Sequence, residues 1–149
     1  MQDRFESFTV LVSKASREVR RIKTEVMSSF NLKSPHVSVI YYLYVGGAMT
    51  SKELCDICDE DKGAISRSIE KLESDGYITV NVVNGKRYKS AISLTQKGED
   101  VGKFLSQKVS FVLDAVSKGV SETDRAIFYK TLTTICKNLS KISGKNKGQ

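Results

Sequence analysis

The chain has 149 residues, a formal net charge of +7 at pH 7 and a pI near 9.3. This length allows one domain with a real hydrophobic core, and the charge suits a polyanion such as nucleic acid, although it would also suit an anionic membrane surface. No apolar run is long enough to span a bilayer and the N-terminus does not resemble a signal peptide, so we expect a cytoplasmic protein with no membrane partner.

A single long helix is predicted over residues 3–30. Its apolar side chains recur at alternating spacings of three and four residues, which is the heptad pattern of a helix that packs along another helix. A small domain cannot cover so long a stripe, so we expect a second subunit to cover it. The stripe comprises Phe5, Phe8, Val12, Ala15, Val19, Ile22 and Val26.

A second helix is predicted to start with Ser34 as N-cap and Pro35 as first helical residue, and to end at Gly46 and Gly47. Its first turn holds the single histidine of the sequence, His36. A lone histidine is poor evidence for a metal site, because zinc takes three or four protein ligands. We therefore predict no metal site and no cofactor.

Two short helices follow, separated by only a few residues. Thr50 is placed to cap the first, with Glu53 reaching back to it in a capping box. Asp61 is placed to cap the second, which ends at Asp75 and Gly76. Helices joined so closely must cross steeply, as in a helix-turn-helix, whose second helix normally enters the major groove of DNA.

The first two turns of this second helix carry predicted DNA contacts. Arg67 is the candidate base reader, since a guanidinium can bond two guanine acceptors at once, and Lys62 is the candidate phosphate contact. Small residues at Gly63 and Ala64 would let the helix N-terminus approach the duplex. The alternative is a solvated basic face. The predicted contacts are Lys62, Gly63, Ala64, Ser66 and Arg67.

A β-hairpin is predicted next. Residues 77–83 are dense in strand-forming side chains, and Asn84-Gly85 is the strongest short hairpin signal that a sequence offers. Basic side chains beside the turn suit a wing that lies along a phosphate backbone or enters a minor groove, although charges also protect exposed strand edges. The predicted wing contacts are Lys86, Arg87 and Lys89, with Arg87 deepest.

Two further helices are predicted over residues 96–143. Thr95 begins the first, and Ser121 with Asp124 forms a capping box at the start of the second. Both have apolar stripes that one small domain cannot cover, so we assign them, with residues 1–30, to dimerisation. A tail of Lys, Gly and Asn at 144–149 is expected to be disordered.

The expected fold is mainly α-helical with one small β-hairpin wing. A winged helix-turn-helix at residues 34–95 is flanked by long N- and C-terminal dimerisation helices, within a single unit over residues 1–149. The two-fold symmetry of such a dimer predicts half-sites about one helical turn apart on DNA.

From Met49 to Gly98 the sequence resembles the MarR family of bacterial transcriptional regulators. The shared motifs are a Thr-capped helix with Glu-Leu at 50–54, an Asp-initiated helix ending Leu-Glu-x-x-Gly at 61–76, a basic wing, and Ser-Leu-Thr-x-x-Gly at 93–98. The resemblance implies an obligate homodimer that binds a pseudo-palindromic double-stranded DNA operator as a repressor and is released by a small-molecule effector or an oxidant.

The wing departs from the family pattern at two positions. The family's wing usually holds Asp-x-Arg, a pair that braces the hairpin, whereas this chain has Lys86 and Tyr88 there. The charged brace is missing. The geometry of the wing and its minor-groove contacts are therefore left open.

Two alternative functions and one excluded class complete the prediction. Cys55 and Cys58 lie one helical turn apart and faintly resemble the thiolate signature of the ArsR metalloid sensors, which would make the chain a thiol- or metalloid-sensing regulator. Acidic neighbours oppose this, since they raise the pKa of a thiol. The other alternative is a winged-helix protein-interaction module. An enzyme is not expected, because one histidine cannot supply a catalytic set and no phosphate-binding glycine loop is present.

Overall fold

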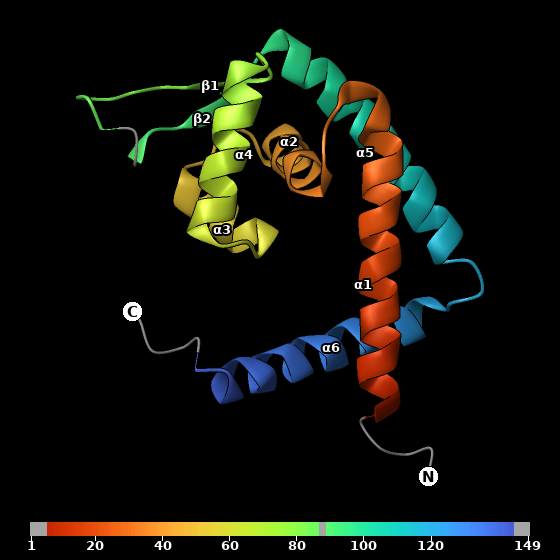
Figure 1. Ribbon diagram of the computed structural model, residues 1–149. Coiled ribbons are helices and arrows are strands. Elements are labelled where there is room, and N and C mark those ends of the chain that lie inside the picture. Colours follow the sequence, from red (N-terminus) through yellow and green to blue (C-terminus); the bar gives the residue numbers. More distant parts are fainter. Residues whose placement is uncertain (1–5, 87–88, 145–149) are drawn as a thin grey trace. The chain divides into compact units, whose positions relative to one another are not determined.

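We describe the computed structural model of the chain over residues 6–86 and 89–144. Within these ranges the chain forms six α-helices, a short 3₁₀-helix and a two-stranded antiparallel sheet (Figure 1), so the predicted fold class is confirmed. Contacts divide the chain into two units, residues 1–109 and 110–149, with the boundary inside α5. The elements are α1 (Glu6–Met27), the 3₁₀-helix (Ser28–Phe30), α2 (Ser34–Gly46), α3 (Ser51–Cys58), α4 (Lys62–Ser74), β1 (Ile78–Val80), β2 (Ile92–Leu94), α5 (Gln96–Val116) and α6 (Glu122–Ile142).

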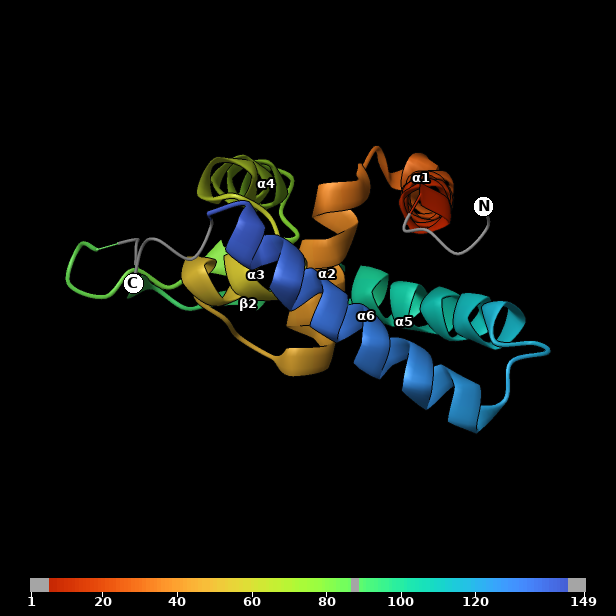
Figure 2. The same ribbon diagram turned by 90° about the horizontal axis from the view of Figure 1, so that it is seen from below.

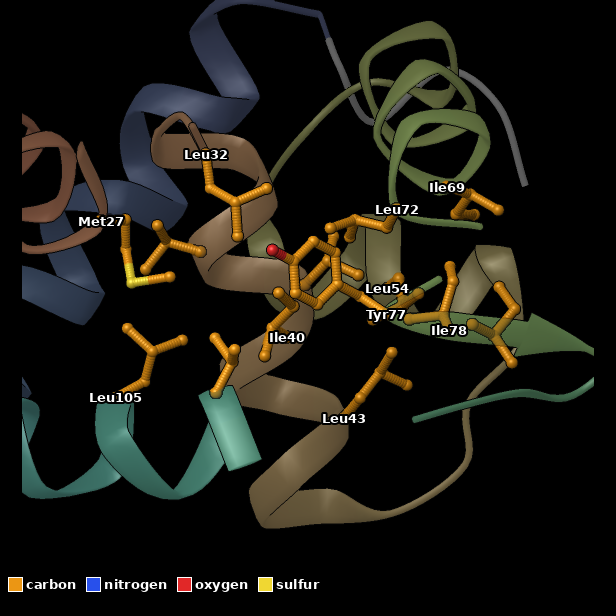
Figure 3. Close-up of a cluster of buried hydrophobic side chains, with 14 of the residues drawn as sticks. Met27, Leu32, Ile40, Leu43, Leu54, Ile69, Leu72, Tyr77, Ile78 and Leu105 are labelled. Carbon is orange, nitrogen blue, oxygen red and sulfur yellow. The ribbon is translucent and has the colours of Figure 1, made fainter. Parts of the chain in front are cut away.

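Helix α2 is the centre of the first unit. It lies between α1 and α4 (Figures 1 and 2) and also contacts α3 and β2. Its periodic apolar side chains meet those of the other elements in one hydrophobic core, in which all the large aliphatic members are nearly or fully excluded from solvent (Figure 3). Fully buried members include Met27, Val39, Ile40, Leu54, Leu72 and Leu105, with at most 1% of their surface exposed.

The start of α2 lies one residue earlier than predicted. Ser34 is the first helical residue and Pro35 the second, and Lys33 is the N-cap. The backbone N–H of Lys33 donates to Nδ1 of His36 at 3.0 Å. His36 therefore plays the part that Glu or Gln takes in a capping box, which requires its Nδ1 to be unprotonated.

This role of His36 predicts a dependence of stability on pH. Burial lowers the pKa of His36 from its usual 6.5, and the nearby cation of Lys71 lowers it further, while Asp75 opposes and Lys33 adds to this effect. His36 in the folded protein binds a proton less well than His36 in the unfolded chain. The contribution of His36 to the free energy of unfolding is therefore fully present above about pH 6.5 and falls as the pH drops below that value. Thermal unfolding from pH 8 to 5 should show a smaller decline in His36→Gln, whose side chain can accept the same bond without titrating. Equal declines in the two proteins would contradict the assignment.

Two local caps set the helix-turn-helix as predicted. The Thr50 backbone N–H donates to the Glu53 carboxylate at 2.7 Å, and the Glu53 N–H donates to Oγ1 of Thr50 at 3.3 Å. The bond from the Thr50 backbone lowers the pKa of Glu53. Asp59 adopts a left-handed conformation (φ 51°) that ends α3, and Asp61 caps α4. Ile57 of α3 lies three residues after the buried Leu54, as an apolar stripe would place it, but it is 44% exposed.

The sheet is shorter than the strand-forming run predicted. Regular pairing joins Ile78 to Leu94, Thr79 to Ser93 and Val80 to Ile92. Met49 adds a bridge to Ile92, with bonds of 3.1 and 2.8 Å between their backbones. The sheet is therefore anchored directly to the residue that precedes the capped start of α3.

The long helices leave much apolar surface uncovered. In α6 no residue is buried, and Ser121 Oγ accepts from the Asp124 N–H at 3.0 Å but donates to the Asp124 carboxylate, so the predicted capping box is only half formed. Phe5, the first residue of the predicted stripe, lies with residues 1–4 outside the described residues, as does most of the expected disordered tail (145–149). Exposed apolar side chains on the three helices include Val10, Leu11, Val12 and Val19 of α1, Phe111, Leu113 and Val116 of α5, and Ile127, Phe128, Leu139 and Ile142 of α6.

None of the helices within residues 6–86 and 89–144 combines the length and the apolar character that crossing a bilayer requires.

Candidate nucleic-acid interface

The start of α4 is fixed by Asp61 and by a buried inner face. Asp61 has an extended backbone, and its Oδ1 accepts a hydrogen bond from the Ala64 N–H at 2.8 Å. The positive end of the α4 dipole, which favours an anion, lies at this capped start. The inner face comprises Ile65, Ser68, Ile69 and Leu72, all buried.

Four of the five contacts predicted on α4 lie on its open face. Lys62, Gly63, Ser66 and Arg67 are exposed, whereas Ala64 is half-buried. Ala64 therefore offers a ligand less surface than its neighbours. The fold brings the four exposed positions together at one end of one helix, as a docked recognition helix requires.

Gly63 leaves space for the Arg67 side chain on the surface of α4. A Cβ atom added to Gly63 would lie 3.2 Å from a guanidinium nitrogen of Arg67 and 3.1 Å from the Asp61 carboxylate. The Arg67 side chain thus runs back along α4 over the bare backbone of Gly63, toward the helix N-terminus. The sequence predicts only that Gly63 lets the helix approach DNA, whereas the geometry gives it a second role in making room for Arg67.

The same face of α4 also carries an acidic residue that the sequence motifs did not identify. Glu70 follows Gly63, Ser66 and Arg67 at helical spacing and is exposed, and Ser66 Oγ donates to it over a long 3.5 Å. The spacing of three and four residues was the signal that could have found it. Because a carboxylate repels phosphate, Glu70 confines the basic part of this face to the first two turns of α4.

The wing carries its predicted lysines at the surface. Asn84 and Gly85 have φ of 53° and 70°, the conformation of a two-residue hairpin turn, and Val83 pairs with Lys86 across it. Lys86 and Lys89 are exposed. Arg87, the deepest contact predicted, lies outside the described residues, as does residue 88.

The Ser-Leu-Thr-x-x-Gly motif joins the end of α4 to the start of α5. Thr95 Oγ1 donates to the Gly76 carbonyl at 2.6 Å and accepts from the Gly98 N–H at 3.1 Å. Lys97 Nζ donates to the Asp75 carbonyl at 2.7 Å and lies 4.2 Å from the centre of the Tyr77 ring. The role of Lys97 was not predicted from the sequence, because Lys97 and its hydrogen-bond partner Asp75 lie 22 positions apart. This junction holds α4 and α5 together at one point.

The cysteines of α3 are in a setting that disfavours thiolates. Burial raises the pKa of Cys58 to about 11, with Glu60 adding to the effect and Lys23 opposing it. Burial and then Asp56 and Asp61 raise the pKa of Cys55. Both side chains are half-buried and pack against the hydrophobic core. Among the described residues no group of three His, Cys, Asp or Glu side chains could hold a metal ion.

A family comparison agrees with this geometry. Residues 30–87, which span α2, α3, α4, β1 and the turn of the wing, match the model of the MarR family. The segment from residue 30 to residue 87 belongs to the MarR family. The family resemblance inferred from the motifs at 49–98 is thereby confirmed.

Proteins similar to this chain match it over most of its length. An HTH-type transcriptional regulator of Bacillus cereus, itself uncharacterised, is 25% identical over 128 residues, which cover 85% of this chain and 84% of that protein. A MarR family regulator from Neisseria meningitidis has the same fold, with a TM-score of 0.82 at 17% identity over 96% of this chain and 98% of the other. The S. aureus MepR–DNA complex gives a TM-score of 0.77 at 17% identity, over 89% and 97%. The expectation that this chain is no enzyme agrees with the matched relatives, which are described as transcriptional regulators.

Proposed function

We propose that this chain is a homodimeric transcriptional regulator that binds a double-stranded DNA operator sequence-specifically. One observation carries the proposal: a carboxylate-capped helix buries one face and leaves Lys62 and Arg67 exposed at its start, in the same unit as a hairpin with exposed lysines. The net charge of +7 favours a polyanion as partner. The proposed contacts are Lys62, Gly63, Ala64, Ser66, Arg67, Lys86, Arg87 and Lys89.

Homodimerisation is supported by the uncovered apolar surface. The exposed large apolar side chains of α1, α5 and α6 have between 41% and 83% of their surface accessible in the single chain. Burial of apolar surface contributes roughly 25 cal/mol per Å² to stability. A dimer in which each copy covers the exposed apolar faces of the other is therefore more stable than the single chain. A two-fold dimer presents two α4 helices and calls for a pseudo-palindromic operator with half-sites about 34 Å apart.

The mode of regulation follows from the family resemblance alone. We propose repression in the cytoplasm by occupation of the operator, with release by a small-molecule effector. The thiol-sensing alternative is less favoured, because the pKa of both α3 cysteines is raised and an unreactive thiol responds slowly to oxidants. The protein-interaction alternative is disfavoured by the basic rather than apolar start of α4.

A DNA titration tests the proposal. Fluorescence anisotropy would compare a duplex from the chain's own upstream promoter with a random duplex, at 50 and 200 mM salt, with and without diamide as oxidant. Light scattering would establish the oligomeric state in the same buffers. We expect a dimer that binds the promoter duplex more tightly, a steep salt dependence for both duplexes, and no effect of diamide.

Other outcomes would redirect the assignment. A folded dimer that binds neither duplex would reject DNA as the partner and favour a protein-interaction module. Loss of promoter binding with diamide, abolished by replacing Cys55 and Cys58 with serine, would support the thiol-sensing regulator. A monomer would contradict the two-fold operator.

A further inference from the structure

The wing has few contacts to hold its return arm in place. Beyond the three regular pairs of the sheet, the Asn81 N–H donates to the Ala91 carbonyl at 2.9 Å. The described residues of the two arms then pair again only at the turn, between Val83 and Lys86. Figure 1 shows the arms extending away from α4 beyond β1 and β2. The carboxylate of the family's bracing pair is absent, because position 86 is a lysine.

One buried hydroxyl bridges this gap. Ser90 is fully buried, with 0% of its surface exposed, and its Oγ donates to the Lys86 carbonyl at 2.6 Å. A carbonyl four residues back is thereby fixed to the base of the wing. A buried hydroxyl without a partner carries an uncompensated desolvation penalty, so the folded protein retains this bond.

We infer that Ser90 is the positioning residue of the wing: its buried hydroxyl fixes the Lys86 backbone and thereby the arm that presents Lys86 to DNA. The inference rests on the proposed function and specifies how this chain orders its wing without an Asp-x-Arg pair. Fixing the arm before binding removes part of the ordering entropy that a mobile wing would lose on the duplex. Ser90 itself touches no DNA.

The same arm offers a matched control. Ser93 lies in β2, is half-buried and pairs with Thr79 across the sheet. Within residues 6–86 and 89–144 its hydroxyl makes no hydrogen bond, in contrast to that of Ser90. Ser93→Ala and Ser90→Ala therefore remove the same atom from the same arm, and only the second removes the bond to Lys86.

The test compares Ser90→Ala, Ser93→Ala and Ser90→Thr in the full-length protein. Binding to the promoter duplex, thermal unfolding and ¹⁵N relaxation of the Val83, Gly85 and Lys86 amides would be measured. In Ser90→Ala we expect about threefold to tenfold weaker binding, as for the loss of one hydrogen bond, and faster amide motion at the turn, with a fall in Tm of no more than about 4 °C. Ser93→Ala should have the promoter affinity and amide relaxation of the wild-type protein. Ser90→Thr should restore promoter binding.

Three results would overturn the inference. One is equal promoter affinity in Ser90→Ala and Ser93→Ala while the original protein binds normally. A second is weaker binding in Ser90→Ala with unaltered amide relaxation at the turn. The third is a fall in affinity that tracks a fall in Tm in both Ser90 variants, because the residue would then support only the core. Absence of duplex binding by the original protein is a different result, since it rejects the proposed function itself.

Discussion

Replacement of Gly98 by alanine is expected to lower the free energy of unfolding by at least about 3 kcal/mol, at the upper end of overpacking effects. A Cβ atom on Gly98 would overlap the Tyr77 carbonyl oxygen and lie 3.0 Å from a Leu94 methyl group. The oxygen belongs to the backbone and also accepts from the Thr95 N–H at 3.0 Å, so it cannot move aside without breaking that bond. Alanine gains only about 1 kcal/mol over glycine in helix propensity, which does not offset the clash.

Thermal unfolding measures this effect directly. For a chain of this size, 3 kcal/mol corresponds to a fall in Tm of roughly 6–12 °C. Lys103→Ala is the matched control, because Lys103 is exposed on the same helix and its replacement should leave Tm nearly unchanged. A Gly98→Ala protein as stable as the original would mean that α5 can shift away from Tyr77, contrary to the close approach described.

Replacement of Arg67 by alanine is expected to reduce promoter affinity by about 1–3 kcal/mol, or roughly 5- to 150-fold, as for loss of a bidentate base contact. Arg67 is exposed on α4 and remote from the buried face, so Tm should not change. Arg67→Lys keeps the charge but lacks the planar fork, and should therefore retain affinity for random DNA while losing preference for the promoter.

Lys62→Ala provides the contrast for Arg67. As a phosphate contact, Lys62 should contribute to all duplexes about equally, and its loss should reduce the slope of log K against log salt by about 1. If Arg67→Ala left both affinity and preference intact, α4 would not be the reading helix. If both variants weakened every duplex to the same extent, Arg67 would be a phosphate contact.

Features set by neighbouring residues were predictable from the sequence. Thr50 with Glu53, Asp61 with Ala64, and the Asn84-Gly85 turn each depend on side chains within three positions along the chain, and the structure has all three. Capping and turn chemistry are local, so one sequence suffices to predict them. The open face of α4 followed from helical spacing alone.

Features that depend on burial or on an unusual capping side chain were not predictable. Nothing near His36 in the sequence indicated that its ring would accept the Lys33 amide, since the usual capping residue there is Glu or Gln. Ser90 resembles any polar residue of a strand until its burial is known. The exposure of Ile57 likewise depends on which elements pack against α3, which periodicity does not reveal.

The Thr95 hydroxyl has a consequence for how this chain can vary. The Thr95 hydroxyl donates to the carbonyl of Gly76, 19 positions earlier in the sequence, and so closes the base of the hairpin loop. The hairpin therefore begins and ends at nearly the same point in space. The hydrogen bond at the base offsets the entropy cost of closing the loop. That cost changes only slowly with the number of residues between Gly76 and Thr95. A substitution at the wing tip, such as Lys86 in place of the usual acidic residue, is therefore expected to leave the folding of the hydrophobic core unaffected. DNA preference can diverge at the tip while selection for stability acts on the base.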